Sequence, residues 1–117
     1  MGFKTAGSEK MRLDSSGNLG LGTTSPNSYN ANGDNLVVAG SGNTGITIAA
    51  GTSDDTNIFF ADGTSGDAAY RGIIRYNHSD DNLEFYTAAT ERMTIDSSGG
   101  VGIGAVSYTH LTLPTKA

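Results

Sequence analysis

Few residues of this chain have the types and spacing that chemistry requires. Residues 40–45 read G-x-G-x-x-G and follow the strand-like residues 36–39, which matches the start of a phosphate-binding loop. That chemistry also needs a helix directly afterwards, because the helix N-terminus holds the phosphate. Residues 46–50 are too few and too β-branched to form a helix before Gly51. We therefore interpret residues 40–45 as a hairpin turn and expect no cofactor.

Acidic residues and one histidine form the other candidate sites. His78 lies beside Asp80 and Asp81, and such a group could bind a metal or transfer protons. A single His without Cys or a second His nearby falls short of a transition-metal site, and turn chemistry accounts for residues 77–82. The acidic residues at 54–55 and 62–67 lack the ligand periodicity and the closing Glu of a calcium loop.

The sequence pattern does not indicate nucleophilic catalysis either, because no Ser is placed near a plausible base and orienting group. The chain has no Cys, which removes thiolate nucleophiles, disulfides and cysteine zinc clusters. We therefore expect no catalytic residue, no cofactor-binding residue and no metal ligand, and we predict that the protein is not an enzyme.

Composition limits the partners and the size of the core. The 12 Asp and Glu outnumber the 7 Lys and Arg without a basic stripe, which argues against nucleic acid. No apolar run is long enough for a membrane span, so no membrane insertion is expected, and no secretory signal is evident. Leu, Ile, Val and Phe number only 22 of 117 residues, whereas Gly numbers 17. A lone copy should therefore be marginally stable, with the missing burial supplied by stacked copies or other subunits.

Short β-branched and aromatic runs separated by turn residues predict an all-β fold. Strands are expected at residues 35–39 and 45–50, which would flank the turn at residues 40–45, and at residues 57–61, 70–76 and 83–87. Folding about the loop at residues 77–82 would oppose Ile74 to Phe85, Ile73 to Tyr86 and Arg75 to Glu84. Residues 88–91 leave room for one helical turn.

An internal repeat is the strongest feature of the sequence. Residues 3–22 recur at residues 85–104, an offset of 82, with 11 of 20 positions identical. We therefore divide the chain into residues 1–26, the end of a preceding repeat with a hairpin at residues 9–22, and residues 27–104, a further repeat whose hairpin lies at residues 91–104. Each hairpin should turn at a left-handed glycine, Gly17 or Gly99. The expected fold is thus a set of short antiparallel hairpins in an extended repeat array, completed by homotrimerisation.

The hairpins have a defined register and a glycine face. Folding about Ser16 and Ser98 opposes apolar residues on one face in both copies: Leu13 to Leu19, Met11 to Leu21, Ile95 to Val101 and Met93 to Ile103. The other face shows only Gly20 and Gly22, repeated as Gly102 and Gly104. Because glycine weakens a strand, its recurrence predicts a backbone that approaches closely on that face, from another subunit or a turn of the array. A simple glycine-rich loop is the alternative.

The repeat breaks off after Gly104. Residues 106–115 resemble a translated transposon-type sequencing adaptor, so we expect residues 105–117 to be a non-native tail in which Tyr108 and His110 carry no function. The alternative is a genuine short strand at residues 108–113.

The repeated motif supports a family resemblance. Three segments resemble the repeats of bacteriophage tail-fibre and tailspike-like proteins. They are residues 91–104, which read E-R-M-T-I-D-S-S-G-G-V-G-I-G, the equivalent segment of the first copy, which ends in G-L-G-T-T-S-P at residues 20–26, and residues 71–86. In those proteins such repeats form stalks upstream of an endosialidase-type intramolecular chaperone. The resemblance covers residues 3–26 and most of residues 58–104, with Gly100 departing from Asn18.

The resemblance implies a homotrimeric fibre in a virion that attaches to bacteria and is assembled in the host cytoplasm. The chaperone's catalytic residues belong to a separate domain, so none is carried over. The expected function is a structural tail-fibre segment, with bacterial glycans bound through other parts of the fibre. Two alternatives remain. One is a glycan-binding β module of a viral or bacterial adhesin, in which Tyr70, Tyr76 and Tyr86 would stack against sugars. The other is a glycan depolymerase fragment, which needs paired carboxylates in a groove, whereas Asp80, Asp81 and Glu84 offer only a loop.

Overall fold

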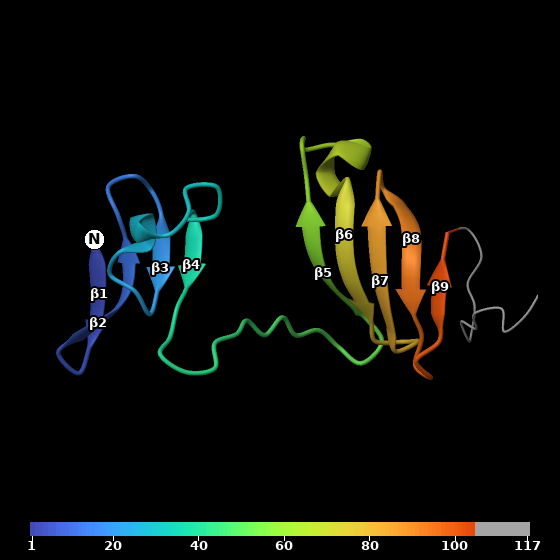
Figure 1. Ribbon diagram of the computed structural model, residues 1–117, viewed down its shortest axis with the longest axis horizontal. Helices are drawn as coiled ribbons and strands as arrows, with labels where there is room; N and C mark the ends of the chain where they lie inside the picture. Colours follow the sequence, from blue (N-terminus) through green and yellow to red (C-terminus); the bar gives the residue numbers. More distant parts are fainter. Residues whose placement is uncertain (105–117) are drawn as a thin grey trace, which may run out of the picture. The chain divides into compact units, whose positions relative to one another are not determined.

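The computed structural model describes residues 1–104 and confirms an all-β fold (Figure 1). These residues form nine strands and two short 3₁₀ helices, with no α-helix among them. The strands belong to two compact units, unit 1 from Met1 to Thr47 and unit 2, which begins at Ile48. The adaptor-like tail and the alternative strand at residues 108–113 lie outside the described residues.

Unit 1 contains one mixed four-stranded sheet in the order β1-β2-β3-β4. Its elements are β1 (Gly2–Thr5), β2 (Ser8–Leu13), β3 (Leu19–Leu21), the 3₁₀ helix η1 (Pro26–Ser28) and β4 (Leu36–Val38). The first two strand pairs are antiparallel, and β4 pairs with β3 in parallel. The unit thus extends past Gly22, where the copied residues end, because β4 hydrogen-bonds back to β3.

The expected hairpin around residues 40–45 is wrong. The strand expected at residues 35–39 exists as β4, but residues 45–50 form no strand, and β4 pairs with β3 instead. The N–H of Leu19 donates to the Asn35 carbonyl at 2.9 Å, and the N–H of Ala39 donates to the Leu21 carbonyl at 2.8 Å. The edge of β3 provides these partners at long range, whereas Ile46 and Ile48 remain exposed and gain no burial from a local hairpin.

Unit 2 contains one antiparallel five-stranded sheet in the order β5-β6-β7-β8-β9. Its elements are β5 (Asp55–Phe60), the 3₁₀ helix η2 (Gly66–Tyr70), β6 (Gly72–Asn77), β7 (Asn82–Thr87), β8 (Thr90–Ile95) and β9 (Val101–Ile103). The predicted register of β6 and β7 is confirmed at Ile73–Tyr86, Ile74–Phe85 and Arg75–Glu84.

Two local expectations in unit 2 need correction. The strand expected at residues 70–76 starts at Gly72, because η2 occupies the residues up to Tyr70. No helical turn forms at residues 88–91, since Ala88 and Ala89 have φ values of 51° and 58° and connect β7 to β8 in a two-residue turn. Such left-handed turns match the right-handed twist of a hairpin, although they favour Asn and Gly.

The sequence repeat is also a structural repeat. The predicted pairs Met11–Leu21 and Leu13–Leu19 recur 82 residues later as Met93–Ile103 and Ile95–Val101. Equivalence extends to the preceding strands, because Phe3 opposes Met11 as Phe85 opposes Met93. Even the irregularity in register recurs, after Phe3 in β1 and after Phe85 in β7. The copied unit is therefore a three-stranded meander rather than a hairpin alone.

The two hairpin turns contain the same pattern of hydrogen bonds. Gly17 and Gly99 have φ values of 87° and 85°, as expected for the left-handed residue of a three-residue loop. Oδ1 of Asp14 accepts the N–H groups of Ser16 and Asn18, each at 2.9 Å. Oδ1 of Asp96 accepts those of Ser98 and Gly100, at 2.9 and 2.8 Å. One carboxylate thus organises each turn, which explains why the D-S-S-G sequence recurs.

Candidate interaction surfaces

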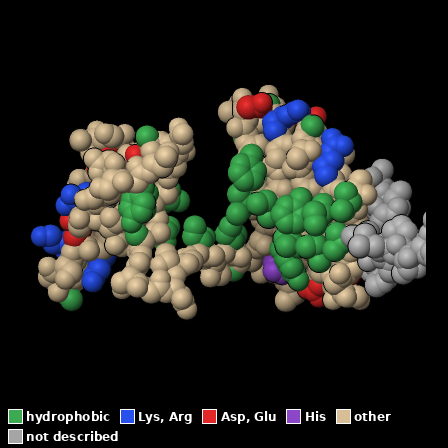
Figure 2. Space-filling model, viewed as in Figure 1, with side chains coloured by type: hydrophobic (Ala, Val, Ile, Leu, Met, Phe, Trp, Pro, Cys, Tyr) green, Lys and Arg blue, Asp and Glu red, His purple; other side chains and the backbone are tan. Residues whose placement is uncertain are grey.

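Unit 2 exposes an apolar sheet face. Residues directly opposite each other in an antiparallel sheet project from the same face, so the register defines that face. We call it the apolar face of unit 2, and it comprises two cross-strand rows: Ile58, Ile74, Phe85, Met93 and Ile103, and Thr56, Tyr76, Leu83, Ile95 and Val101. Figure 2 shows hydrophobic side chains gathered over this sheet. Ile58 and Ile103 remain 46% and 59% exposed.

The apolar face of unit 2 includes a hollow. Its volume is about 130 Å³, and its lining includes Ile48, Ile58, Ile74, Tyr76 and Leu83. Ile48 comes from the segment before β5 and extends the apolar surface beyond the sheet. The lining is almost entirely apolar, so the hollow suits an aliphatic or aromatic side chain better than a polar ligand.

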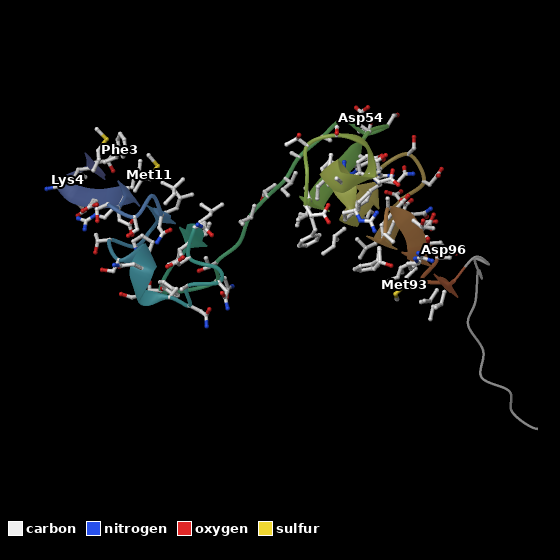
Figure 3. The ribbon with its side chains drawn as sticks, turned by 90° about the horizontal axis from the view of Figure 1, so that it is seen from above. Phe3, Lys4, Met11, Asp54, Met93 and Asp96 are labelled. Carbon is white, nitrogen blue, oxygen red and sulfur yellow. The ribbon has the colours of Figure 1, made fainter. Side chains whose placement is uncertain are left out.

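Unit 1 exposes an equivalent face. Its apolar face comprises the rows Phe3, Met11, Leu21 and Val38, and Leu13, Leu19 and Leu36. Figure 3 shows Phe3 and Met11 on the same side of the ribbon. Every one of these side chains is at least partly exposed. The buried Val37 and Pro26 belong to the opposite face, with Gly20.

The reverse face of unit 2 carries a partly buried polar network centred on Arg75. Its guanidinium donates to Asn57 Oδ1 at 2.8 Å, lies 3.9 Å from Glu84 Oε2 and stacks 5.1 Å from the centre of the Tyr86 ring. Tyr86 in turn donates its hydroxyl to Glu84 at 3.3 Å. The predicted Arg75–Glu84 ion pair is therefore present. Asp55 adds a second carboxylate 3.6 Å from Arg75 Nε.

Burial raises the pKa of Glu84, and the nearby Glu91 carboxylate raises it further, while Arg75 opposes both effects. Burial likewise raises the pKa of Tyr86, with the Glu84 charge adding to the shift. Thr94, another buried member of this face, donates its hydroxyl to Glu91. Neighbouring side chains thus account for the polar groups, and the network serves to hold the sheet together.

The two faces of unit 2 therefore show an unusual distribution of burial. Glu84 and Thr94 are only 7% and 8% exposed, whereas Ile58, Ile74 and Ile103 on the opposite face are 46%, 37% and 59% exposed. Contiguous exposed apolar surface is uncommon on soluble monomers and marks sites of association. We take the apolar faces of units 1 and 2 as the candidate functional surfaces. The sequence predicted the apolar pairs of the two copied hairpins and the opposition of Ile74 to Phe85. It did not predict the contributions of β4 and β5, nor the exposure of these faces, because both depend on which distant segments pack together.

The three tyrosines considered for glycan stacking do not share one surface. Tyr76 lies on the apolar face, with its ring 4.9 Å from that of His78, and donates to Asp81 at 3.3 Å. Tyr86 lies on the reverse face beneath Arg75. Tyr70 ends η2 and donates to Asp67 at 3.2 Å. A stacking platform would need at least two of these rings on one side.

The other candidate residues are also dispersed. Asp80 and Asp81 lie in the turn between β6 and β7, whereas Glu84 lies within β7. His78 Nε2 is 3.4 Å from the Thr56 hydroxyl. No group of three or more His, Cys, Asp or Glu that could hold a metal ion occurs within residues 1–104, and none of the helices there is long and apolar enough to cross a membrane.

The glycine face of β3 meets a closely approaching backbone, which belongs to the same chain. A Cβ at Gly20 would lie 2.8 Å from the Thr23 carbonyl oxygen and 3.4 Å from Pro26 Cδ. A Cβ at Gly22 would overlap the Ala39 carbonyl. The close approach predicted from the sequence is confirmed in unit 1, but its predicted source in another subunit or a turn of the array is wrong there. Pro26, which is fully buried three residues after Thr23, belongs to the segment that makes this approach.

A scan against protein-family models, a search of curated proteins and a search of solved structures each found no match.

Proposed function

We propose that this chain is a non-enzymatic structural segment of a bacteriophage tail fibre, in which three copies of the chain cover one another's apolar faces. The segment would hold a receptor-binding tip away from the virion, and other parts of the fibre would contact bacterial glycans. Assembly would take place in the host cytoplasm. The repeated motif supports the fibre assignment, and the surfaces of both units support the association.

The uncovered apolar face of unit 2 carries this proposal. It spans five strands and is continuous from Ile58 in β5 to Ile103 in β9. Burying a Leu, Ile or Phe side chain contributes about 1.5–3 kcal/mol, so a face of this size represents a large gain on association. Without a partner, the sheet leaves this face open to water and forgoes that gain.

Light scattering on the full chain tests the proposal directly. The expected mass is three times the chain mass of 12.0 kDa. Association should protect the backbone amides of β5 to β9 from hydrogen exchange in a concentration-dependent manner. A folded monomer at high concentration would contradict the proposal, and a folded dimer would contradict the three-fold arrangement.

A glycan-binding β module of a surface adhesin is the competing function. Binding of the full chain to an array of bacterial glycans, weakened by replacing Tyr76 or Tyr86, would favour that function. The tail-fibre proposal predicts no binding by this segment. Release of sugars from a bacterial polysaccharide would instead indicate an enzyme, which the proposal also excludes.

A further inference from the structure

The outer edges of β3 and β9 are equivalent positions of the repeated meander. In unit 1 that edge is covered, because β4 pairs with β3 in parallel at Leu19–Leu36, Gly20–Val37 and Leu21–Val38. In unit 2, β9 is the last strand of the sheet, and no strand of the described residues pairs with its outer edge. Among residues 1–104, the structure therefore contains one paired and one unpaired example of the same edge.

The open edge keeps the geometry of the filled one. Gly22 and Gly104 have φ values of 82° and 84°, and each donates its N–H to the strand before, at 3.0 Å to Lys10 and 2.8 Å to Arg92. The Ala39 carbonyl lies directly against Gly22, whereas a Cβ at Gly104 would have no neighbour within 4 Å. The conformation that receives the end of β4 is thus present in unit 2, where no described strand occupies it.

Exposure of the equivalent apolar side chains agrees with this difference. Leu21 is 38% exposed beside Val38 of β4, while Ile103, its counterpart in β9, is 59% exposed. An unpaired strand edge is also a template for a further strand, because its N–H and C=O groups have no partner in the sheet. The edge of β9 thus offers both hydrogen-bonding groups and an apolar neighbour.

We propose that the outer edge of β9 is the docking site for a second copy of residues 23–39, whose Leu-Val-Val stretch would add to unit 2 as a parallel sixth strand. The register would match unit 1, so that the Val101 N–H donates to the carbonyl equivalent to Asn35 and the Ile103 carbonyl accepts the N–H equivalent to Ala39. β4 identifies this occupant, since it already fills the same edge in unit 1. The proposal concerns how successive repeats join and does not depend on the tail-fibre assignment.

The test is a full chain with a second copy of residues 23–47 inserted directly after Gly104. Hydrogen exchange at the Val101 amide should slow by about tenfold or more relative to the parent chain, because that N–H becomes part of a strand ladder. The Leu19 amide, which already donates to Asn35, serves as the internal reference for a folded and paired edge.

A matched control carries Pro at the position equivalent to Ala39 in the inserted copy alone, which removes the N–H that would bond to the Ile103 carbonyl. This variant should lose most of the added protection at Val101 while Leu19 stays protected. Equal exchange at Val101 in the parent, inserted and Pro-containing chains, with Leu19 protected in all three, would overturn the proposal. Protection lost at Leu19 and absent at Val101 would overturn it as well, since the two copies would then compete for one edge.

Discussion

Arg75 and Glu84 oppose each other across β6 and β7, with Nη1 of Arg75 3.9 Å from Oε2 of Glu84, on the face opposite the exposed Ile74. The better buried side of this sheet is therefore its polar side. Since a buried charge needs partners to offset its desolvation, the network around Arg75 is essential to unit 2. The apolar side then remains for association.

Replacing Arg75 with Met should destabilise the protein. The change leaves Glu84 buried without its cation, and we expect the free energy of unfolding at pH 7 to fall by about 1–3 kcal/mol in urea titrations. Arg75 retains some contact with water, which keeps the loss below that of a fully buried pair. Arg12→Met, which breaks the more exposed pair with Glu9, should have a much smaller effect. Equal losses for the two variants would contradict this account.

Glu84 should also introduce a pH dependence of known sign. Because burial raises its pKa, the folded protein retains this proton to higher pH than the unfolded chain. Its contribution to stability is therefore fully present below the ordinary value of 4.5 and is lost as the pH rises through the raised pKa. Compared with Glu84→Gln, the parent chain should gain relative stability as the pH falls from 7 towards 4.5. If the difference in unfolding free energy between the two proteins stays constant with pH, or changes in the opposite direction, the pKa of the Glu84 carboxyl is not raised in the folded protein.

The β7–β8 turn should be improved by glycine. Ala89 has a φ of 58°, whereas its counterpart in the first copy is Gly7, with a φ of 78°. Because a left-handed conformation costs an L-residue about 1–2 kcal/mol, and Gly costs about 0.5–1 kcal/mol in chain entropy, Ala89→Gly should stabilise unit 2 by about 0.5–1 kcal/mol. Gly7→Ala should destabilise unit 1 by a similar amount. Thermal and urea unfolding measure both changes, and effects of the same sign would contradict the prediction.

Ile58 and Phe59 provide a matched test of the apolar face of unit 2. They are neighbours in β5, are 46% and 53% exposed, and project from opposite faces of the sheet. Ile58→Lys should reduce the mass found by light scattering to that of a monomer, because a charge in a buried interface is strongly unfavourable. Phe59→Lys should leave the oligomer intact. Loss of association with the second variant alone would place the interface on the reverse face.

Because the Thr23 carbonyl lies close to Gly20, adding a Cβ at this position should destabilise the protein. In Gly20→Ala the added methyl would lie 2.8 Å from the Thr23 carbonyl, so either β3 or the buried Pro26 segment must move. We expect a loss of about 1–3 kcal/mol in the free energy of unfolding, typical of overpacking. Gly42→Ala is the control, since a Cβ there would meet nothing within 4 Å. Similar stabilities of these two variants would mean that the segment from Thr23 to Pro26 does not pack on β3 in solution.

Local patterns were enough to predict much of the fold. The sequence alone determined the all-β class, the registers of both copied hairpins, the left-handed Gly17 and Gly99, and the opposition of Arg75 to Glu84. Each of these depends on residues close in the chain, where alternation and turn chemistry decide the pairing. The failure at Ala88 and Ala89 is also local, because nothing in two alanines signals a left-handed turn.

Tertiary structure alone decided the features that link distant segments. The pairing of β4 with β3 replaced the expected hairpin because Leu36–Val38 found hydrogen-bond partners on an edge that no local pattern reveals. The approach of the Ala39 carbonyl to Gly22 follows from that pairing. The burial of Glu84 behind an open apolar face was likewise unpredictable, since alternation assigns residues to two faces but does not say which face a neighbour will cover.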